Sequence, residues 1–300
     1  MNKGEAAALR PRLLVLAAAA LFSTGGAAIK SVSLTGWQVA SLRSAVAVVT
    51  LAILLPNSRR RPSPSMILVG VFYAATLILF VQATKLTTAA DAIFLQDTAP
   101  LYVLLAAPFL LGERVVKADL WFMLALAVGL SFFFVGTEAP IGTAPNPFVG
   151  NVAAAASGLT WAGTVIGLRG LGTRSPDGSA IEPALLTGTA MSAIFALWPA
   201  LPITGVSLHD WSIVIFLGVI QIGLAYACLS KGLPGVPAVE ASLLLLLEPV
   251  LNPIWSWMVH GEKPGPWQFG GGALILSATA VRAWWDARSG DRDQGTGVRA

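Results

Sequence analysis

Two carboxyl side chains stand inside strongly apolar stretches of the sequence, each close to a proline. Asp97 lies shortly before Pro100, and Glu248 directly precedes Pro249. An ionisable group among apolar side chains is expensive, so each carboxylate needs a partner or a function. Pro249 and Pro253 lack the amide hydrogen that would bond the carbonyl one turn earlier, which leaves carbonyl oxygens free near Glu248. A carboxylate beside free carbonyls suits a substrate ammonium group or a proton. The alternative is a structural kink, with Glu248 protonated or hydrogen-bonded to a neighbouring helix.

Other polar residues accompany these carboxylates. Asn252 and Trp255 follow Glu248 at four and seven residues, so all three share one helical face. Gln96 directly precedes Asp97. We expect the two stretches to form opposite walls of one polar cavity; the alternative is hydrogen bonding between helices alone.

Aromatic and hydroxyl side chains stand halfway along two further apolar stretches. Trp161 lies with Thr160 and Thr164 at helical spacing, and Tyr73 is followed one heptad later by Phe80. A tryptophan at mid-span is not part of an interfacial aromatic belt. We expect these residues to line the cavity, with ordinary helix packing as the alternative. The candidate substrate-binding residues are therefore Tyr73, Gln96, Asp97, Trp161, Thr164, Glu248 and Asn252.

Some charged residues have a structural explanation. Arg43 lies within an apolar stretch, and we expect it to pair with a carbonyl or a carboxylate near a helix end. We expect Glu113 and Glu262 to cap helix ends against Arg114 and Lys263.

No residue set for enzymatic chemistry stands out. His209 and His260 fall in expected loops and Cys228 is the one cysteine, so no metal-ligand spacing is present. The sequence also lacks the glycine-rich phosphate loop G-x-x-x-x-G-K-[ST] and a recognisable nucleophile-base pair. We predict no metal, no cofactor and no catalytic activity.

The elements that must position the candidate residues are membrane helices. Of the 300 residues, 55% are hydrophobic and 11% are charged, and the mean hydropathy is +0.73; soluble domains carry about 25% charged residues. A run of about 20 apolar residues crosses the hydrocarbon core as a helix. We predict an all-α polytopic membrane protein with ten transmembrane helices. The expected spans are 13–29, 36–56, 66–83, 92–111, 118–136, 149–168, 183–201, 211–230, 238–259 and 267–285. The spans 118–136 and 267–285 carry few polar groups away from their ends, so we expect them to lie away from the cavity.

Lysine and arginine set the orientation of these spans. Of the 19 such residues, Arg43 lies within a span and only Lys30, Lys85 and Lys263 fall in the segments on one side, which leaves fifteen on the other. The positive-inside rule then places both termini in the cytoplasm, in a bacterial inner membrane. The first span also resembles a signal peptide. Cleavage would spoil the charge asymmetry, so we expect this span to stay.

An internal duplication is visible when the chain is shifted against itself. A shift of 149 residues places Pro100 on Pro249, and Gly112-Glu113-Arg114 on Gly261-Glu262-Lys263. We predict a first five-helix repeat over residues 1–140, a second over 147–290, and a cytoplasmic tail over 291–300. Five spans is an odd number, so the second repeat would enter the membrane inverted, as in many transporters. The alternative is chance similarity between apolar segments.

These features resemble the drug/metabolite transporter superfamily, EamA type, over residues 13–285. The resemblance rests on the paired five-helix halves, the proline and Gly-Glu-Arg/Lys motifs, and Leu42-Arg43 in the second span. Within the superfamily the chain is most similar to bacterial amino-acid exporters of the YddG type. Phe22-Ser23-Thr24 stands where Trp-Ser-Thr is typical, and Trp161 fits the aromatic position. The resemblance adds Phe22 and Ser23 to the candidate substrate-binding residues. Asp97 and Ala99 stand where such exporters carry aromatic residues.

The predicted function is export of small organic metabolites, aromatic and other amino acids foremost, by alternating access. The partners would be the small-molecule substrate and the lipid bilayer, with no nucleic acid. One alternative is a drug or nucleotide-sugar carrier of the same fold. A phosphate-bearing substrate would need Arg or Lys at the midplane, where this chain carries mostly carboxylates. A membrane-embedded transferase or hydrolase is the alternative from another class.

Overall fold

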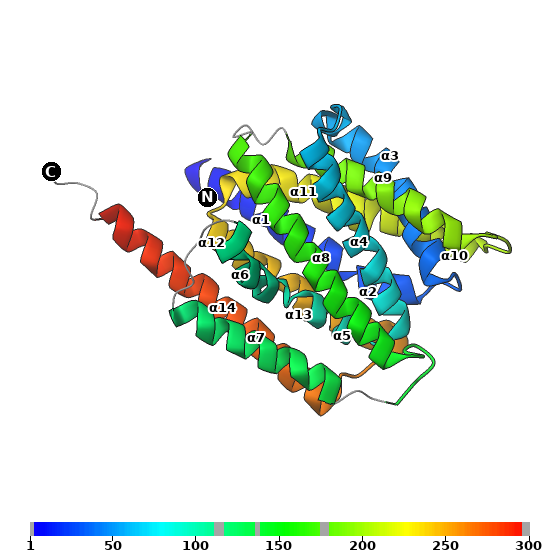
Figure 1. Cartoon of the computed structure of the whole chain (residues 1–300). Helices are drawn as coiled ribbons and strands as arrows, with labels where there is room; N and C mark the ends of the chain where they lie inside the picture. The colour runs from blue at the N-terminus through cyan, green and yellow to red at the C-terminus, as the bar shows by residue number, and fades with distance from the viewer. Residues whose placement is uncertain (1–2, 111–116, 136–138, 175–179, 296–300) are drawn as a thin grey trace.

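The computed structural model describes residues 3–110, 117–135, 139–174 and 180–295. Within these ranges the chain is helical apart from one isolated bridge between Ile141 and Ala144. The helices of Figure 1 are α1 (Lys3–Ser23), α2 (Gly25–Lys30), α3 (Gly36–Leu54), η1 (Pro56–Arg59), α4 (Pro64–Leu86), α5 (Ala89–Gln96), α6 (Ala99–Leu110), α7 (Lys117–Val135), α8 (Pro147–Arg174), α9 (Ile181–Ala200), α10 (Leu208–Phe216), the π-helical η2 (Leu217–Leu224), α11 (Ala225–Gly232), η3 (Leu233–Gly235), α12 (Ala238–Leu245), α13 (Leu247–His260) and α14 (Pro266–Gly295).

Nine segments of the described chain are long and apolar enough to cross a membrane. They are Leu9–Lys30, Gly36–Leu54, Pro64–Leu86, Ala89–Ala106, Lys117–Val135, Pro147–Gly172, Ile181–Ala200, Leu208–Gly235 and Glu240–His260. The expected tenth span, 267–285, is helical as part of α14 but is not among them. Gln268, Arg282 and three consecutive glycines make this segment less apolar than the others. Ten transmembrane helices in two inverted repeats therefore stay a prediction.

Two of the spanning segments are broken beside the prolines singled out in the sequence. α5 ends at Gln96 and α6 begins at Ala99, while α12 ends at Leu245 and α13 begins at Leu247. Pro100 cannot donate to the Gln96 carbonyl and Pro249 cannot donate to the Leu245 carbonyl, so the regular bonding pattern is interrupted there. The breaks bring Asp97 and Glu248 to the points where each helix restarts.

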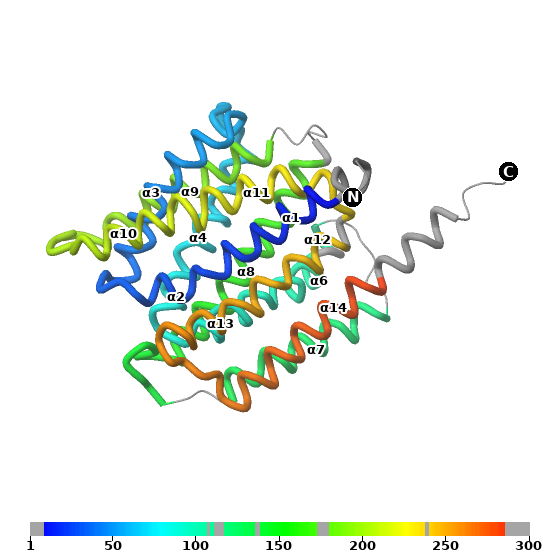
Figure 2. Tube along the Cα trace, turned by 180° about the vertical axis from the view of Figure 1, so that it is seen from behind, coloured from blue at the N-terminus to red at the C-terminus, as the bar shows by residue number. Residues whose placement is uncertain are grey.

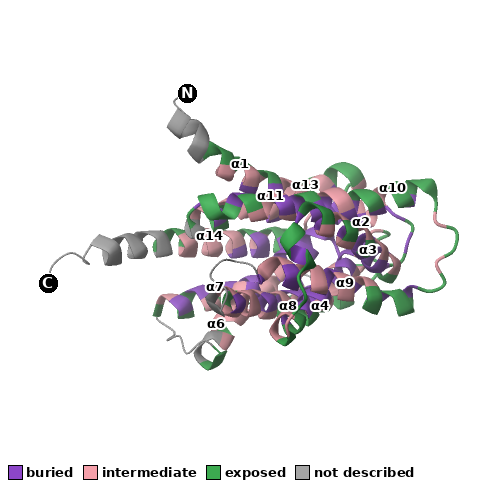
Figure 3. Cartoon of the chain, turned by 90° about the horizontal axis from the view of Figure 1, so that it is seen from above, coloured by how far each residue is buried: buried purple, intermediate pink, exposed green. Residues whose placement is uncertain are grey.

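Helices from the two halves of the chain pack against one another. The most extensive contacts join α4 to α8 and α9, and α3 to α9. Gly70 and Gly188 permit the close crossing of α4 and α9, since a Cβ atom on Gly70 would lie 3.1 Å from the Gly188 amide nitrogen. α7 and α14 lie side by side at one edge of the bundle (Figures 1 and 2). Buried residues gather on the facing sides of the helices, and exposed residues on the outer faces (Figure 3).

The bundle has two ends, which we call the terminal end and the far end. At the terminal end, α1 begins and α14 ends, on the same side of the molecule (Figures 1 and 2). At the far end, α2 and α13 finish, and α3, α5, α8, α10 and α14 begin. Three helices start with hydroxyl caps: the hydroxyl groups of Thr35, Ser63 and Ser207 accept from backbone amides in the first turns of α3, α4 and α10. Of these three caps, the one at Ser63 lies at the terminal end because α4 runs in the opposite direction.

Candidate substrate-binding cavity

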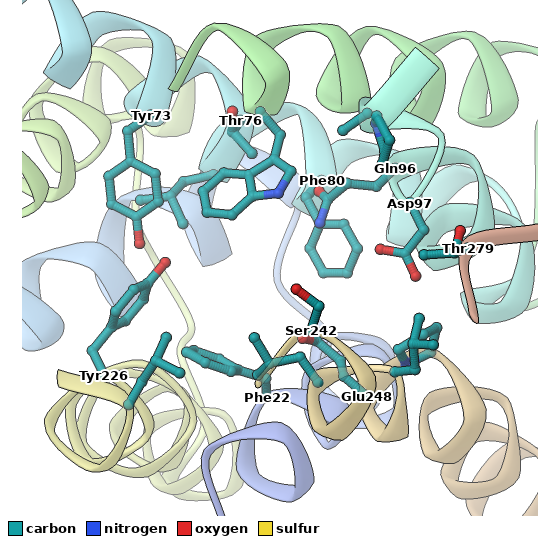
Figure 4. Close-up of a pocket in the computed structure, with 18 of the residues that line it drawn as sticks. Phe22, Tyr73, Thr76, Phe80, Gln96, Asp97, Tyr226, Ser242, Glu248 and Thr279 are labelled. Carbon is teal, nitrogen blue, oxygen red and sulfur yellow. The ribbon is translucent and has the colours of Figure 1, made fainter. Parts of the chain in front are cut away.

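A cavity of about 360 Å³ lies halfway along the bundle, between the broken helices. This volume is in the range of small-molecule sites. Its wall is built by α1, α3, α4, α5, α6, α8, η2, α11, α12, α13 and α14. Toward the terminal end the wall includes the exposed Ser242. Figure 4 shows Gln96 and Asp97 on one wall, with Ser242 and Glu248 on the facing wall.

Asp97 and Glu248 both line this cavity. Asp97 follows the last residue of α5, and its Oδ2 atom has no hydrogen-bond partner. Its carboxyl group points into the cavity beside Thr279 of α14 (Figure 4). Glu248 lies on the wall that faces Asp97 (Figure 4). Gln96 is held by α8, because Ser157 Oγ donates to Gln96 Oε1 at 2.6 Å. The breaks therefore place two acids, from the two halves of the chain, in one cavity.

Arg43 of α3 is a further charged residue of the wall. The residue is 1% exposed, and its Nη2 atom donates to the Leu77 carbonyl at 3.1 Å. The contact with a carbonyl agrees with the sequence-based expectation, but Leu77 lies in the middle of α4 and not near a helix end. That the guanidinium group also lines the cavity was not expected, because the sequence does not show which face of α3 turns inward.

An aromatic wall runs beside the charged groups. The ring centroids of Tyr73 and Trp161 are 6.2 Å apart, and those of Tyr73 and Tyr226 are 6.1 Å apart. Phe22 of α1 packs edge-on against Tyr226 at 5.0 Å. Tyr226 and Gln221 of the same span are wall residues that sequence reasoning missed. The signal was present, since Tyr226 is one of only three tyrosines and stands inside an apolar span.

The candidate residues divide into two groups. Phe22, Tyr73, Gln96, Asp97, Trp161 and Glu248 lie in the wall of the cavity, whereas Ser23, Thr164 and Asn252 do not. Ser23 Oγ accepts from Trp255 Nε1 at 2.9 Å, and Thr164 Oγ1 donates to the Thr160 carbonyl at 3.0 Å. Asn252 is fully buried against Gly26 of α2. α13 is covered by α2 one turn beyond Glu248, so the shared helical face does not continue along the cavity. Substrate binding by any of these residues stays a prediction.

Of the two spans expected to lie away from the cavity, one does and the other does not. α7 contributes no residue to the wall, but Ile275, Leu276 and Thr279 of α14 do. The expectation for residues 267–285 is therefore wrong. α14 also contacts α12 and α5, the helices that are broken beside the cavity, and these contacts bring its middle turns inward.

A buried ion pair lies at the far end of the bundle. Lys30 Nζ and Glu262 Oε1 are 2.9 Å apart, and their side chains are only 2% and 4% exposed. Lys30 also donates to the carbonyls of Thr87, at 2.7 Å, and Thr143. Glu262 Oε2 accepts from the Ala89 amide at 3.0 Å, at the start of α5. The expected pairing of Glu262 with Lys263 is therefore wrong, because Glu262 turns inward to a lysine of the other half. The matching expectation for Glu113 and Arg114 lies outside the described residues.

Among the described residues, no three His, Cys, Asp or Glu side chains gather as a group that could hold a metal ion. The acids of the cavity are a pair, accompanied by aromatic rings and an arginine. Such a set can bind a small polar molecule, with the rings in contact with its apolar part.

Comparison with known proteins agrees with this architecture. The EamA-like transporter family matches the chain twice, over residues 10–135 and 148–283. One solved protein structure aligns with a TM-score of 0.61 at 22% identity, covering 93% of this chain and 98% of that chain, which shows a shared fold.

Two curated relatives cover most of the sequence. "Pseudopaline exporter CntI" of Pseudomonas aeruginosa (strain UCBPP-PA14) is 25% identical over 279 residues, which is 89% of this chain and 93% of the relative. An "Uncharacterized transporter" of Archaeoglobus fulgidus is 27% identical over 225 residues, which is 75% of this chain and 77% of the relative. Neither name mentions amino acids, so the narrower resemblance to YddG-type exporters stays a prediction. With both halves matched and the helical architecture in place, the chain belongs to the EamA-like transporter family of multi-pass membrane proteins.

Proposed function

We propose that this protein exports small organic metabolites, amino acids among them, across the inner membrane by alternating access. The observation that carries the proposal is the cavity itself, with Asp97 and Glu248 at two helix breaks beside an aromatic wall. Substrate sites of secondary transporters lie near the bilayer midplane, where broken helices meet. The relative named as an exporter supports the direction of transport.

The conformation described here fits one stage of such a cycle. The far end is covered by the buried Lys30–Glu262 pair, while the wall reaches toward the terminal end at Ser242. With both termini in the cytoplasm, as the positive-inside rule predicts, the cavity would receive substrate from the cytoplasm. Export then requires the far end to open and the terminal end to close. We propose that residues 1–140 and 147–290, as inverted repeats, move against one another in this change.

Counterflow in proteoliposomes tests this function. Vesicles holding the purified protein are loaded with an unlabelled amino acid and diluted into the same amino acid in labelled form. We expect labelled L-phenylalanine to accumulate transiently, and only in vesicles that contain the protein. Chromatography of the vesicle contents should return unchanged phenylalanine. A chemically altered product would instead support the enzyme alternative, and counterflow confined to nucleotide sugars would support the carrier alternative.

A further inference from the structure

The cavity contains one basic and two acidic side chains, and these do not form ion pairs with one another. The structure shows ion pairs at Arg12–Glu240, Lys30–Glu262 and Arg282–Asp119. Arg43, Asp97 and Glu248 take part in none of them, although all three line the same wall. An arginine and two carboxylates therefore share one cavity without neutralising each other.

The arginine is incompletely satisfied. A guanidinium group has five N–H donors arranged as a planar fork. In Arg43 one nitrogen, Nη2, donates to the Leu77 carbonyl, and Nε has no hydrogen-bond partner. Burying a cation costs several kcal/mol of free energy because the cation loses its water. Attraction to a buried anionic partner can offset a cost of that order. Because the described protein supplies no carboxylate to Arg43, a bound ligand is the natural source of that anion.

The two kinds of charge lie toward different parts of the cavity. Arg43 contacts α4 at Leu77, one turn from Tyr73. In Figure 4 the hydroxyl groups of Tyr73 and Tyr226 point toward one another on one side of the cavity. Asp97 points into the cavity on the other side, beside Thr279. The cavity therefore has a basic side, where Arg43 lies one turn from Tyr73, and an acidic side, at Asp97 and Glu248.

We propose that Arg43 binds the carboxylate of the substrate while Asp97 and Glu248 hold its ammonium group, so that the transporter selects zwitterions. This inference rests on the proposed function and narrows its substrate class. A guanidinium fork matches a carboxylate in geometry, and such charge-assisted hydrogen bonds are about twice as strong as neutral ones. A molecule that lacks either charge leaves a buried group unpaired, and a site built in this way rejects it strongly.

The test compares four molecules that share a benzyl side chain. L-Phenylalanine carries both charges, its amide and phenethylamine carry only the positive charge, and 3-phenylpropionate carries only the negative charge. Each competes against labelled phenylalanine in counterflow. We expect phenylalanine to compete at least about tenfold more strongly than the three others, which corresponds to one charged hydrogen bond. Equal competition by the amide would overturn the zwitterion inference while leaving transport itself in place. Absence of counterflow with phenylalanine would instead count against the proposed function.

Substitution of the arginine supplies the second half of the test. In Arg43→Gln the phenylalanine amide should compete as well as phenylalanine, because the carboxylate has lost its partner. Arg60→Gln, at an exposed position after η1, is the matched control and should keep the wild-type order. Binding to the detergent-purified protein, measured as the rise in melting temperature with each compound, should follow the same order without relying on transport.

Arg43→Lys provides the same test if the glutamine variant does not fold. A lysine keeps the charge but lacks the fork. We expect the preference for phenylalanine over its amide to fall several-fold. An unchanged preference in either variant would overturn the role of Arg43. Competition by inorganic phosphate or a sugar phosphate, stronger than by phenylalanine, would show that Arg43 serves a phosphate-bearing substrate and would overturn the proposal as well.

Discussion

The two ends of the bundle are each tied by an ion pair that joins the two halves of the chain, yet the pairs differ in burial. At the far end, Lys30 and Glu262 are 2.9 Å apart with side chains 2% and 4% exposed. At the terminal end, Arg12 and Glu240 are 2.5 Å apart with side chains 42% and 33% exposed. An exposed pair contributes little because water and salt screen it. In a buried pair, the loss of one partner leaves the other charged and desolvated. The same type of interaction is thus shielded from water at the far end and partly exposed to water at the terminal end.

Under the proposed alternating access, this difference predicts which end resists opening. Opening of the far end must separate Lys30 from Glu262 and also release the Ala89 amide and the Thr87 carbonyl. At the terminal end, the ion pair between the two halves joins partly exposed groups. The described conformation, with its wall reaching the terminal end, is the one that this asymmetry favours.

The largest effect should follow from breaking the far-end pair. Glu262→Gln leaves the Lys30 ammonium buried without its anion, at a cost of about 3–5 kcal/mol. We expect the far end to open in a large part of the population. The measurement is labelling by a membrane-impermeant maleimide of a cysteine placed at Val32, a buried far-end residue, in a Cys228→Ser background.

A paired substitution serves as the control for that result. Replacing both charges, as Lys30→Met with Glu262→Leu, removes the pair and leaves Asp91, which accepts from Thr87 Oγ1, as the remaining buried carboxyl group of this network. Buried pairs are often replaced in this way at little cost. The double variant should protect the Val32→Cys probe again. Equal labelling of single and double variants would contradict the idea that an unpaired charge, rather than lost packing, opens this end.

Substitution of Asp97 or Glu248 in the cavity should have a different effect from substitution of the carboxylates at the two ends, because neither Asp97 nor Glu248 is ion-paired. In Glu248→Gln the amide keeps the hydrogen-bonding capacity, so we expect a stable protein whose counterflow rate is lower by about tenfold, the effect of one charge-assisted hydrogen bond. If Glu248 also exchanges protons, the pH dependence of transport should flatten. Asp97→Asn is the partner variant on the facing wall. Full transport with the original pH dependence in Glu248→Gln would return this residue to a structural role.

A smaller effect is expected from the aromatic wall. Trp161→Ala removes a ring 6.2 Å from that of Tyr73. Counterflow of phenylalanine should fall by about threefold relative to that of alanine, in line with the energy of one aromatic contact. The ratio of the two rates is the measurement, because it cancels differences in expression. An unchanged ratio would show that substrate side chains do not contact Trp161.

The smallest effect should come from the terminal-end pair. Arg12→Gln removes an interaction between half-exposed groups, so we expect a melting temperature and a counterflow rate close to those of the wild type. This variant is the direct counterpart of Glu262→Gln. A comparable loss in both would remove the distinction between the two ends.

Much of the architecture could be predicted because it depends on local composition. Apolar runs of sufficient length identify membrane spans, and a proline within such a run can interrupt the helix, as near Pro100 and Pro249. Contacts between residues far apart in the sequence do not depend on local composition. Lys30 and Glu262 pair across 232 positions of the chain (262 minus 30), and no local pattern distinguishes Lys30 from Lys263 as the partner of Glu262.

The cavity wall was harder to predict than the spans. Helical spacing shows which residues share a face, but not toward which neighbour the face turns. Asn252 shares a face with Glu248 yet is buried against α2, and Thr279 reaches the wall from a helix expected to lie outside it. Tyr226 and Arg43 carry polar groups within apolar spans, which is itself a signal. Their position beside Tyr73 depends on the crossing of α3, α4 and α11, which tertiary packing decides.

The close crossing at Gly70 and Gly188 bears on the order in which the chain is made. α3 and α4 have their most extensive contacts with α8 and α9, which a ribosome produces only after the whole first half. Until α8 and α9 are made, the glycine-containing face of α4 must contact lipid or another protein. Helices in a bilayer can insert first and associate later, so this delay is compatible with stable insertion. The tightly packed centre of the molecule is therefore completed late in translation, and a nascent chain arrested near residue 140 would hold α3 and α4 in the membrane without the neighbours that fix their place.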